Sequence, residues 1–211
     1  MHVRTATAAD APACAEIYAP YVTETAVSFE EAAPSAEEMA RRIETAHEWL
    51  VLEDGGRVVG YAYAATFHPR AAYRWACEVS VYLARGCERR GGGRALYDVL
   101  LARLVERGFR VAIAGMTLPN PGSVALHRAF GFEPVGTYRR IGYKFGAWHD
   151  VAWSQRMLVD TDDPPQELAG SGAGASRTPG SPRPTSAPVN DRIAVTPSAG
   201  PNPSTNAAGE S

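Results

Sequence analysis

The residues with the clearest chemical potential form the glycine-rich segment Glu88-Arg89-Arg90-Gly91-Gly92-Gly93-Arg94. Apolar periodicity predicts a strand over 75–83 before this segment and a helix over 94–107 after it. Glycines at such a junction let the backbone approach a ligand, and the unpaired N–H groups at the start of a helix favour an anion. The segment therefore fits a diphosphate group, although the glycines alone fit a flexible turn equally well.

Better-known glycine loops and cysteine motifs do not match the chain. A dinucleotide-binding loop needs G-x-G-x-x-G and an acid about 20 residues further on, and a P-loop needs G-x-x-x-x-G-K-[ST]. Arg90-Gly91-Gly92 is a single copy of a unit that RNA-binding tails repeat. Cys14, Cys77 and Cys87 are an odd number without metal-ligand spacing, so we expect packed thiols, no disulfide frame and no metal.

The strand predicted before the glycine segment has two different faces. Residue alternation places Glu78, Ser80 and Tyr82 together, opposite an apolar face. A carboxylate in that position could serve as an acid or a base. A solvated strand face is the simpler interpretation when the strand is considered by itself.

The other elements predict a mixed α/β domain in the order β-α-α-β-β-β-α-β-α-β-β. Asp54-Gly55 predicts a tight hairpin, and the pairs Tyr61/Tyr63 and Tyr138/Tyr143 are expected to pack within the sheet. Predicted strands cover 3–6, 49–52, 58–63, 75–83, 111–116, 135–141 and 148–159. Predicted helices cover 7–21, 36–46, 94–107 and 120–131.

Composition divides the chain into a folded domain over 1–159 and a tail over 160–211. The tail has no Phe, Trp or Tyr and is rich in Pro, Ser, Gly and Ala, so we expect it to be disordered. It carries 3 of the 21 basic and 6 of the 23 acidic residues, which leaves the domain with 18 basic and 17 acidic residues.

A nearly neutral domain argues against nucleic acid as a partner, because phosphate neutralisation needs a concentrated basic face. No apolar stretch reaches the roughly 18 residues of a membrane span, and the first residues lack the apolar region of a signal peptide. We therefore expect a cytoplasmic protein that acts on a small molecule and binds neither nucleic acid nor membrane.

Two segments resemble the GNAT acetyltransferase superfamily. Gly91 and Gly93 occupy the glycine places of its acetyl-CoA loop, R/Q-x-x-G-x-G/A, with Glu88 where Gln or Arg is usual. The stretch 120–132 resembles N-x-x-A-x-x-L-Y-x-x-x-G-F, with His127 in the place of the tyrosine. The resemblance implies a GNAT fold, which is a mixed, mostly antiparallel central sheet flanked by helices, and acetyl-CoA as co-substrate.

Further segments resemble one GNAT family, the phosphinothricin N-acetyltransferases. They are 17–30, Arg70-Ala-Ala-Tyr73-Arg-Trp75, 78–82, 118–124 and Gly142-Tyr-Lys-Phe-Gly-Ala-Trp-His-Asp-Val151, within a likeness that covers about 2–158. Such enzymes acetylate the free amine of phosphinothricin, methionine sulfoximine or methionine sulfone. His68 stands where the herbicide-resistance enzymes have lysine, which lowers the fixed positive charge and favours the two methionine derivatives.

The resemblance also implies the roles of individual residues. Glu78 corresponds to the general base and His127 to the proton donor for the CoA thiolate. The residues implied for acetyl-CoA are Val81, Tyr82, Leu83, Arg89, Arg90, Gly91, Gly92, Gly93, Arg94, Asn120 and Ser123. Those implied for the amino-acid substrate are Phe29, His68, Arg70 and Tyr73. The family further implies a homodimer.

Two other functions fit the same motifs. One is a GNAT enzyme for another small amine or for a protein N-terminus. The other is a regulator that binds acyl-CoA without catalysis, although Glu78, Asn120 and His127 favour an enzyme.

Overall fold

The structure is a computed structural model and describes residues 1–169; the disorder predicted for the rest of the tail lies outside these residues. Seven strands form one sheet in the order β1-β2-β3-β4-β5-β7-β6. Neighbouring strands run antiparallel except β4 and β5, which are parallel. The strands are β1 (His2–Thr5), β2 (Glu48–Asp54), β3 (Arg57–Thr66), β4 (Ala76–Leu83), β5 (Val111–Thr117), β6 (Glu133–Lys144) and β7 (Ala147–Met157). The predicted fold class is confirmed.

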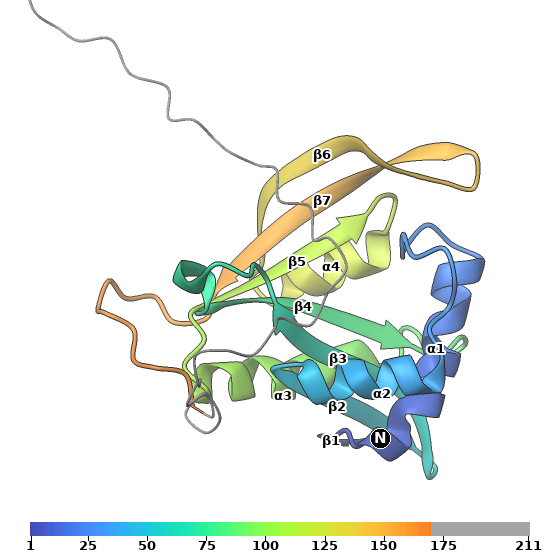
Figure 1. The fold of residues 1–211 in the computed structure, drawn as a ribbon, viewed down its shortest axis with the longest axis horizontal. Coiled ribbons are helices and arrows are strands. Elements are labelled where there is room, and N and C mark those ends of the chain that lie inside the picture. The colour runs from blue at the N-terminus through green and yellow to red at the C-terminus, as the bar shows by residue number, and fades with distance from the viewer. Residues whose placement is uncertain (170–211) are drawn as a thin grey trace, which may run out of the picture. The chain divides into compact units, whose positions relative to one another are not determined.

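Helices cover both faces of this sheet (Figure 1). α1 (Ala11–Thr23) and α2 (Ala36–Thr45) lie on one face, over a core that includes Trp49 and Tyr61. α3 (Gly92–Glu106) and α4 (Pro121–Ala129) lie on the other, where Leu96, Leu100 and Leu104 of α3 are fully buried. Two short 3-10 turns, η1 (Ala8–Asp10) and η2 (Ala71–Tyr73), complete the described elements.

Local sequence signals explain where several elements begin and turn. Ser35 caps α2 by accepting a hydrogen bond of 3.1 Å from the N–H of Glu38, as the S-x-x-E pattern predicts. The β2–β3 hairpin turns through Gly55 and Gly56, with φ of +58° and +76°. Both values suit glycine, and the predicted tight hairpin is therefore confirmed.

The chain continues to pack beyond residue 159. Residues 160–169 were assigned to the tail from composition, yet the N–H of Ala169 donates to the carbonyl of Arg107 at 3.0 Å, and Leu168 packs against the core on the α3 side. Leu168 and a few hydrogen bonds hold this stretch against the domain. Composition averages over many residues and therefore does not reveal a segment that is held by so few contacts.

Candidate active site

The sheet opens between its two parallel strands. β4 and β5 pair at only three positions, Ala76 with Val111, Cys77 with Ala112 and Glu78 with Ile113. After Glu78 the strands separate, while β4 stays paired with β3 as far as Leu83. Backbone groups of β4 beyond Glu78 therefore face a gap on the β5 side, where a ligand can take the place of a neighbouring strand.

Pockets for small ligands usually measure about 300–1,000 Å³. The gap between β4 and β5 holds a cleft of ≈ 680 Å³. Its walls are Val79–Leu83 of β4, Gly115–Thr117 of β5, the glycine segment and the first turns of α4. The residues predicted to bind acetyl-CoA that line this cleft are Val81, Tyr82, Leu83, Arg89, Gly91, Gly92, Gly93, Arg94, Asn120 and Ser123. Arg90 is exposed and is not among the lining residues.

The glycine segment forms a turn that leads directly into α3. The helix begins at Gly92, two residues earlier than predicted, and Gly91 precedes it with a left-handed φ of +83°. A Cβ on Gly92 would lie 2.8 Å from Cδ2 of Leu52, so the core itself requires glycine there. The first N–H groups of α3 have no partner within the helix, and the positive end of its dipole lies at the cleft. The cradle therefore suits a diphosphate.

Glu88, the departure from the acetyl-CoA loop pattern, has a local structural role. Its Oε2 accepts a hydrogen bond of 2.8 Å from the backbone N–H of Gly86 and so closes the turn before the glycine segment. The residue also lines the cleft. A carboxylate therefore lies on the wall that would hold an anionic ligand.

Glu78 lies at the point where β4 and β5 separate. It pairs with Ala65 of β3 and points to the face covered by α1 and α2, opposite the core residues Cys77 and Val79. The side chain is partly buried, and this burial raises the pKa of the Glu78 carboxyl above its ordinary value. Contacts with arginine lower the pKa of two other carboxyl groups, Asp10 and Glu38, so the shift of Glu78 is in the opposite direction. The simpler interpretation of a solvated strand face is wrong.

His127 is buried, with 4% of its surface exposed, and both ring nitrogens have partners. Its Nδ1 lies 2.8 Å from the carbonyl oxygen of Ser123, and its Nε2 lies 2.9 Å from the hydroxyl of Tyr97. A carbonyl only accepts, so Nδ1 carries the proton and Nε2 accepts from Tyr97. Burial also lowers the pKa of His127 despite the opposing Ser123 contact. The ring is thus neutral and would have to release Tyr97 before Nε2 could exchange a proton with a ligand.

The residues predicted for the amino-acid substrate fall into two groups, and none of them lines the acetyl-CoA cleft. His68, Arg70 and Tyr73 share the loop between β3 and β4; the His68 and Tyr73 rings lie 4.7 Å apart. Nδ1 of His68 accepts a hydrogen bond of 3.2 Å from the N–H of Arg70, so this nitrogen carries no proton. Phe29 lies instead in the α1–α2 loop, 6.2 Å from the His149 ring.

Lys144 ties the β6–β7 hairpin to the α1–α2 loop. Its Nζ donates to the carbonyl oxygens of Val22, Ser28 and Glu30 at 2.6, 2.6 and 2.8 Å. The Phe29 ring lies against Gly142 of β6, where a Cβ would come within 2.3 Å of it. The hairpin thus fixes the loop that presents Phe29.

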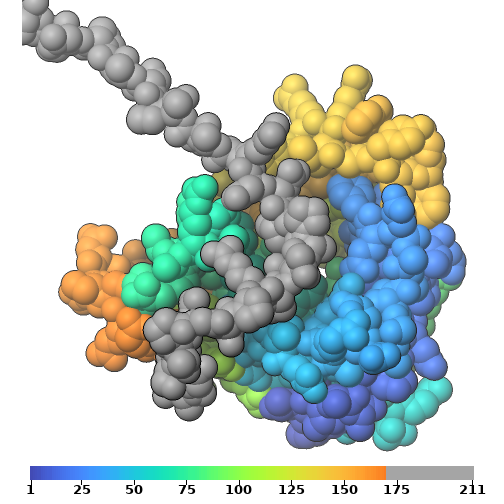
Figure 2. Space-filling view, in the orientation of Figure 1, coloured from blue at the N-terminus to red at the C-terminus, as the bar shows by residue number. Residues whose placement is uncertain are grey.

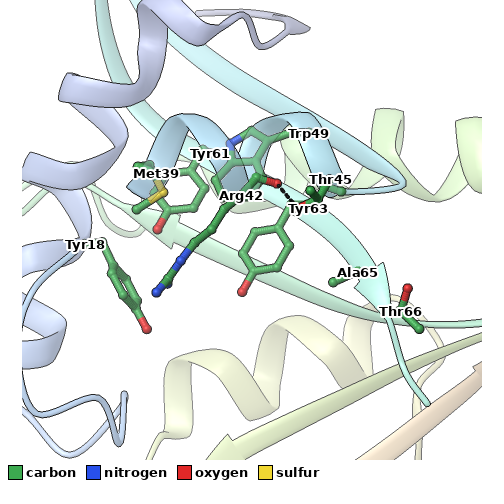
Figure 3. Close-up of a pocket in the computed structure, with 10 residues that line it drawn as sticks. Tyr18, Met39, Arg42, Thr45, Trp49, Tyr61, Tyr63, Ala65 and Thr66 are labelled. Atoms are coloured by element: carbon green, nitrogen blue, oxygen red, sulfur yellow. Dashed lines mark hydrogen bonds between the residues drawn. The ribbon is translucent and has the colours of Figure 1, made fainter. Parts of the chain in front are cut away.

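A second pocket of ≈ 400 Å³ lies between α2 and strands β2 and β3 (Figure 3). Trp49 stacks on Tyr63 with ring centroids 4.5 Å apart and on Tyr61 at 5.2 Å, which confirms that this tyrosine pair packs in the sheet. Burial raises the pKa of Tyr63, and the nearby charge of Glu78 adds a smaller effect in the same direction. Tyr63 therefore connects the pocket to the face on which Glu78 lies.

Sequence reasoning did not identify Tyr63 or Tyr97 as neighbours of the candidate catalytic residues. Tyr97 is fully buried in the α3 core, in a helical stripe whose spacing indicates packing only. Its partner His127 lies 30 positions later on α4, so the contact depends on how the two helices pack. A buried hydroxyl needs a hydrogen-bond partner, which was the one available signal.

The fold and cleft define an acyl-CoA-dependent transferase, and comparison with known proteins agrees. Residues 3–153 match the model of the acetyltransferase (GNAT) domain, so the chain belongs to the GNAT acetyltransferases.

Several relatives are more specific. The phosphinothricin N-acetyltransferase of Streptomyces viridochromogenes is 39% identical over 159 residues, which cover 74% of this chain and 87% of that protein. The L-methionine sulfoximine/L-methionine sulfone acetyltransferase of Salmonella typhimurium is 30% identical, and the match covers 75% of this chain and 95% of that protein. The crystal structure of a phosphinothricin acetyltransferase from Sinorhizobium meliloti in complex with acetyl-CoA is 39% identical, with a TM-score of 0.77 and coverage of 81% of this chain and 96% of that chain.

No helix of residues 1–169 is long and apolar enough to cross a membrane. Within the same range, no group of three or more His, Cys, Asp or Glu side chains is placed to hold a metal ion.

Proposed function

We propose that the chain transfers the acetyl group of acetyl-CoA directly to the free amine of phosphinothricin-like amino acids: phosphinothricin, methionine sulfoximine and methionine sulfone. The observation that carries the proposal is the opening between β4 and β5, which begins directly after the partly buried Glu78 and contains a diphosphate cradle at Gly91–Gly93. The names of the relatives support the same substrates.

The acetyl-CoA thioester supplies the activated acyl group. The N–H groups at the start of α3, with Arg89 and Arg94 beside them, hold the diphosphate, and the edge of Val81–Leu83 that β5 leaves uncovered orients the arm that carries the thioester. This arrangement brings the acyl carbonyl towards the end of the β4–β5 pairing.

Glu78 removes a proton from the ammonium group of the substrate, directly or through a water molecule. Its raised pKa suits this role, because a more basic carboxylate accepts the proton more readily. We assign His127 as the proton donor to the CoA thiolate. Because burial raises the pKa of Tyr97, its hydroxyl is a poor source of this proton: Nε2 releases the Tyr97 hydroxyl, takes a proton from solvent and passes it to the thiolate.

Arg70 and Tyr73 bind the anionic groups of the amino acid, and Phe29 forms an apolar wall. Arg70 is exposed and has a planar guanidinium that matches a carboxylate. His68 accepts a hydrogen bond from Arg70 at Nδ1 and, unlike the lysine of the herbicide-resistance enzymes, supplies no permanent positive charge. We therefore expect methionine sulfone and sulfoximine to be better substrates than phosphinothricin, which carries one more anionic group.

We also propose that the protein is a homodimer and works in the cytoplasm. The predicted packing of Tyr138 and Tyr143 within the sheet holds only in part: Tyr143 packs across the strands on Trp148, with ring centroids 5.2 Å apart, but the two tyrosines are 53% and 62% exposed and Trp148 is 60% exposed. An exposed apolar surface of this kind on the long β6–β7 hairpin suits a second copy of the chain.

The free thiols of Cys14, Cys77 and Cys87 fit a reducing compartment.

A thiol-release assay with acetyl-CoA tests the reaction. The amine panel contains methionine sulfone, methionine sulfoximine, phosphinothricin and a peptide with a free N-terminus. We expect turnover of the first three and none of the peptide. Preference for the peptide or for an unrelated amine would reassign the substrate, and binding of acetyl-CoA without CoA release for any amine would indicate a regulator.

Sedimentation velocity tests the assembly. We expect a dimer for the native chain and a shift towards monomer for Trp148→Ser. A monomeric native chain at micromolar concentration would contradict the proposal.

A further inference from the structure

The segment after β7 returns to the loop that carries Arg70 and Tyr73. In Figure 1 the orange chain leaves the end of β7, bends away and comes back towards the end of α3, and in Figure 2 its atoms lie beside those of the β3–β4 loop. The indole N–H of Trp75 donates to the carbonyl oxygen of Gln166 at 2.8 Å. Arg74 forms an ion pair with Glu167 at 3.2 Å.

Leu168 anchors this segment on the other side. Its side chain is partly buried and packs against the core cluster beneath α3. Gly108, which follows α3 with a left-handed φ of +93°, lies against it: a Cβ on Gly108 would be 3.7 Å from Cδ2 of Leu168. The neighbouring Ala169 pairs with Arg107. The segment thus bridges the end of α3 and the β3–β4 loop.

Trp75 transmits this attachment to the loop. Its carbonyl oxygen accepts from the N–H of Arg110 at 2.8 Å, which fixes the backbone next to β5. The Arg74 guanidinium covers the indole ring at 3.9 Å and also donates to the carbonyl of Ala71 at 3.3 Å. The Arg74 side chain therefore links the Ala71 carbonyl of the short turn η2 to the indole ring of Trp75, whose N–H donates to Gln166.

We propose that residues 166–168, here called the clasp, position the substrate loop over 67–75 and so lower the KM for the amino acid. The inference rests on the proposed function for its effect on KM. The loop is largely exposed and its tip depends on η2, so without the clasp it would have to be ordered at the moment of substrate binding. Trp75 and Leu168 are positioning residues, since neither is proposed to touch a reacting atom.

The test uses the full chain with two variants that weaken the clasp at its two ends. Leu168→Ser removes the apolar anchor, and Trp75→Phe removes the indole donor but keeps an aromatic ring. Leu168→Met is the conservative control, and Asp162→Ala changes an exposed residue of the same segment. The measurements are kcat, the KM for methionine sulfone, the KM for acetyl-CoA, the Tm, and hydrogen exchange of the amides of 67–75.

We expect Leu168→Ser and Trp75→Phe to raise the KM for the amine about threefold or more, with kcat and the KM for acetyl-CoA changed less than about twofold. Exchange of 67–75 should become faster, and both controls should behave as the native chain. An unchanged KM and unchanged exchange would overturn the proposal, as would an equal rise in both KM values with a lower Tm, which indicates general loosening. If the native chain acetylates none of the amines, the proposed function fails, and exchange of 67–75 still decides whether the clasp holds the loop.

Discussion

Replacing Glu78 by Gln tests the chemistry of the site most directly. The change keeps the shape of a side chain that lies where β4 and β5 separate, and removes only its ability to accept a proton. A positioned general base contributes about 10²- to 10⁴-fold to a rate. We therefore expect kcat to fall by that range, about 3–5 kcal/mol in activation free energy, with acetyl-CoA affinity unchanged because the cleft lies beyond Glu78.

The pH dependence of kcat/KM should also report the protonation of Glu78. Only the carboxylate accepts a proton, and burial raises its pKa above the ordinary 4.5, so the rising limb of kcat/KM should lie at higher pH than for an exposed glutamate. The sign for stability is opposite to that of a salt-bridged acid. A raised pKa stabilises the fold at low pH and this contribution is lost as pH rises, so Glu78→Gln should be at least as stable as the native chain at neutral pH.

Thiol release with methionine sulfone as substrate measures the rate between pH 5 and 9. Calorimetry measures the affinity for acetyl-CoA. Glu106→Gln, an exposed change on α3, is the matched control and should leave every quantity as it is. Undiminished turnover of Glu78→Gln, with native acetyl-CoA affinity and an unchanged acid limb, would refute the assignment of the base.

Three further changes test other parts of the molecule. Glu88→Gln removes a negative charge from the cleft wall and keeps an oxygen for Gly86, so calorimetry should show tighter acetyl-CoA binding; weaker binding would contradict this. Tyr97→Phe leaves Nε2 of His127 buried without its donor and should cost about 1–3 kcal/mol in urea unfolding; an unchanged stability would contradict the contact. Asp10, whose pKa its contact with Arg4 lowers to about 2, should stabilise the fold above about pH 4 and lose this effect as pH falls towards 2. The stability of Asp10→Asn, followed by acid titration, should therefore lack this loss between about pH 4 and 2. An acid transition identical to that of the native chain would contradict the prediction.

Local patterns in the sequence predicted the order of the elements and the glycine turn between β4 and α3: alternation along β4, apolar spacing along α3 and glycines between them. Acetyl-CoA as the ligand of this turn came from the family resemblance, and the residues assigned to bind it remain predictions. The cleft is formed largely by backbone groups and by residues close to one another in the chain. The strands and helices that carry these groups set their positions, so a prediction of the elements also predicts most of the cleft.

The remaining parts depend on contacts between distant segments. Alternation along β4 does not show what packs on each face of the strand, and Glu78 is partly buried. His127 contacts Tyr97 of another helix, and Trp75 of the β3–β4 loop contacts Gln166 of the segment after β7. Tertiary packing determines each of these burial states and contacts. The residue periodicity within one strand or helix does not show which distant segment packs against it.

Lys144 has a consequence for chemical labelling. It is the chain's one lysine beside 20 arginines, and in the fold its ammonium donates to three carbonyl oxygens. While the β6–β7 hairpin is docked, the amine has no free electron pair to offer an acylating reagent. Modification of this single position by an amine-directed ester would therefore report how often the hairpin detaches from the α1–α2 loop, and its rate would give the opening equilibrium without an engineered probe.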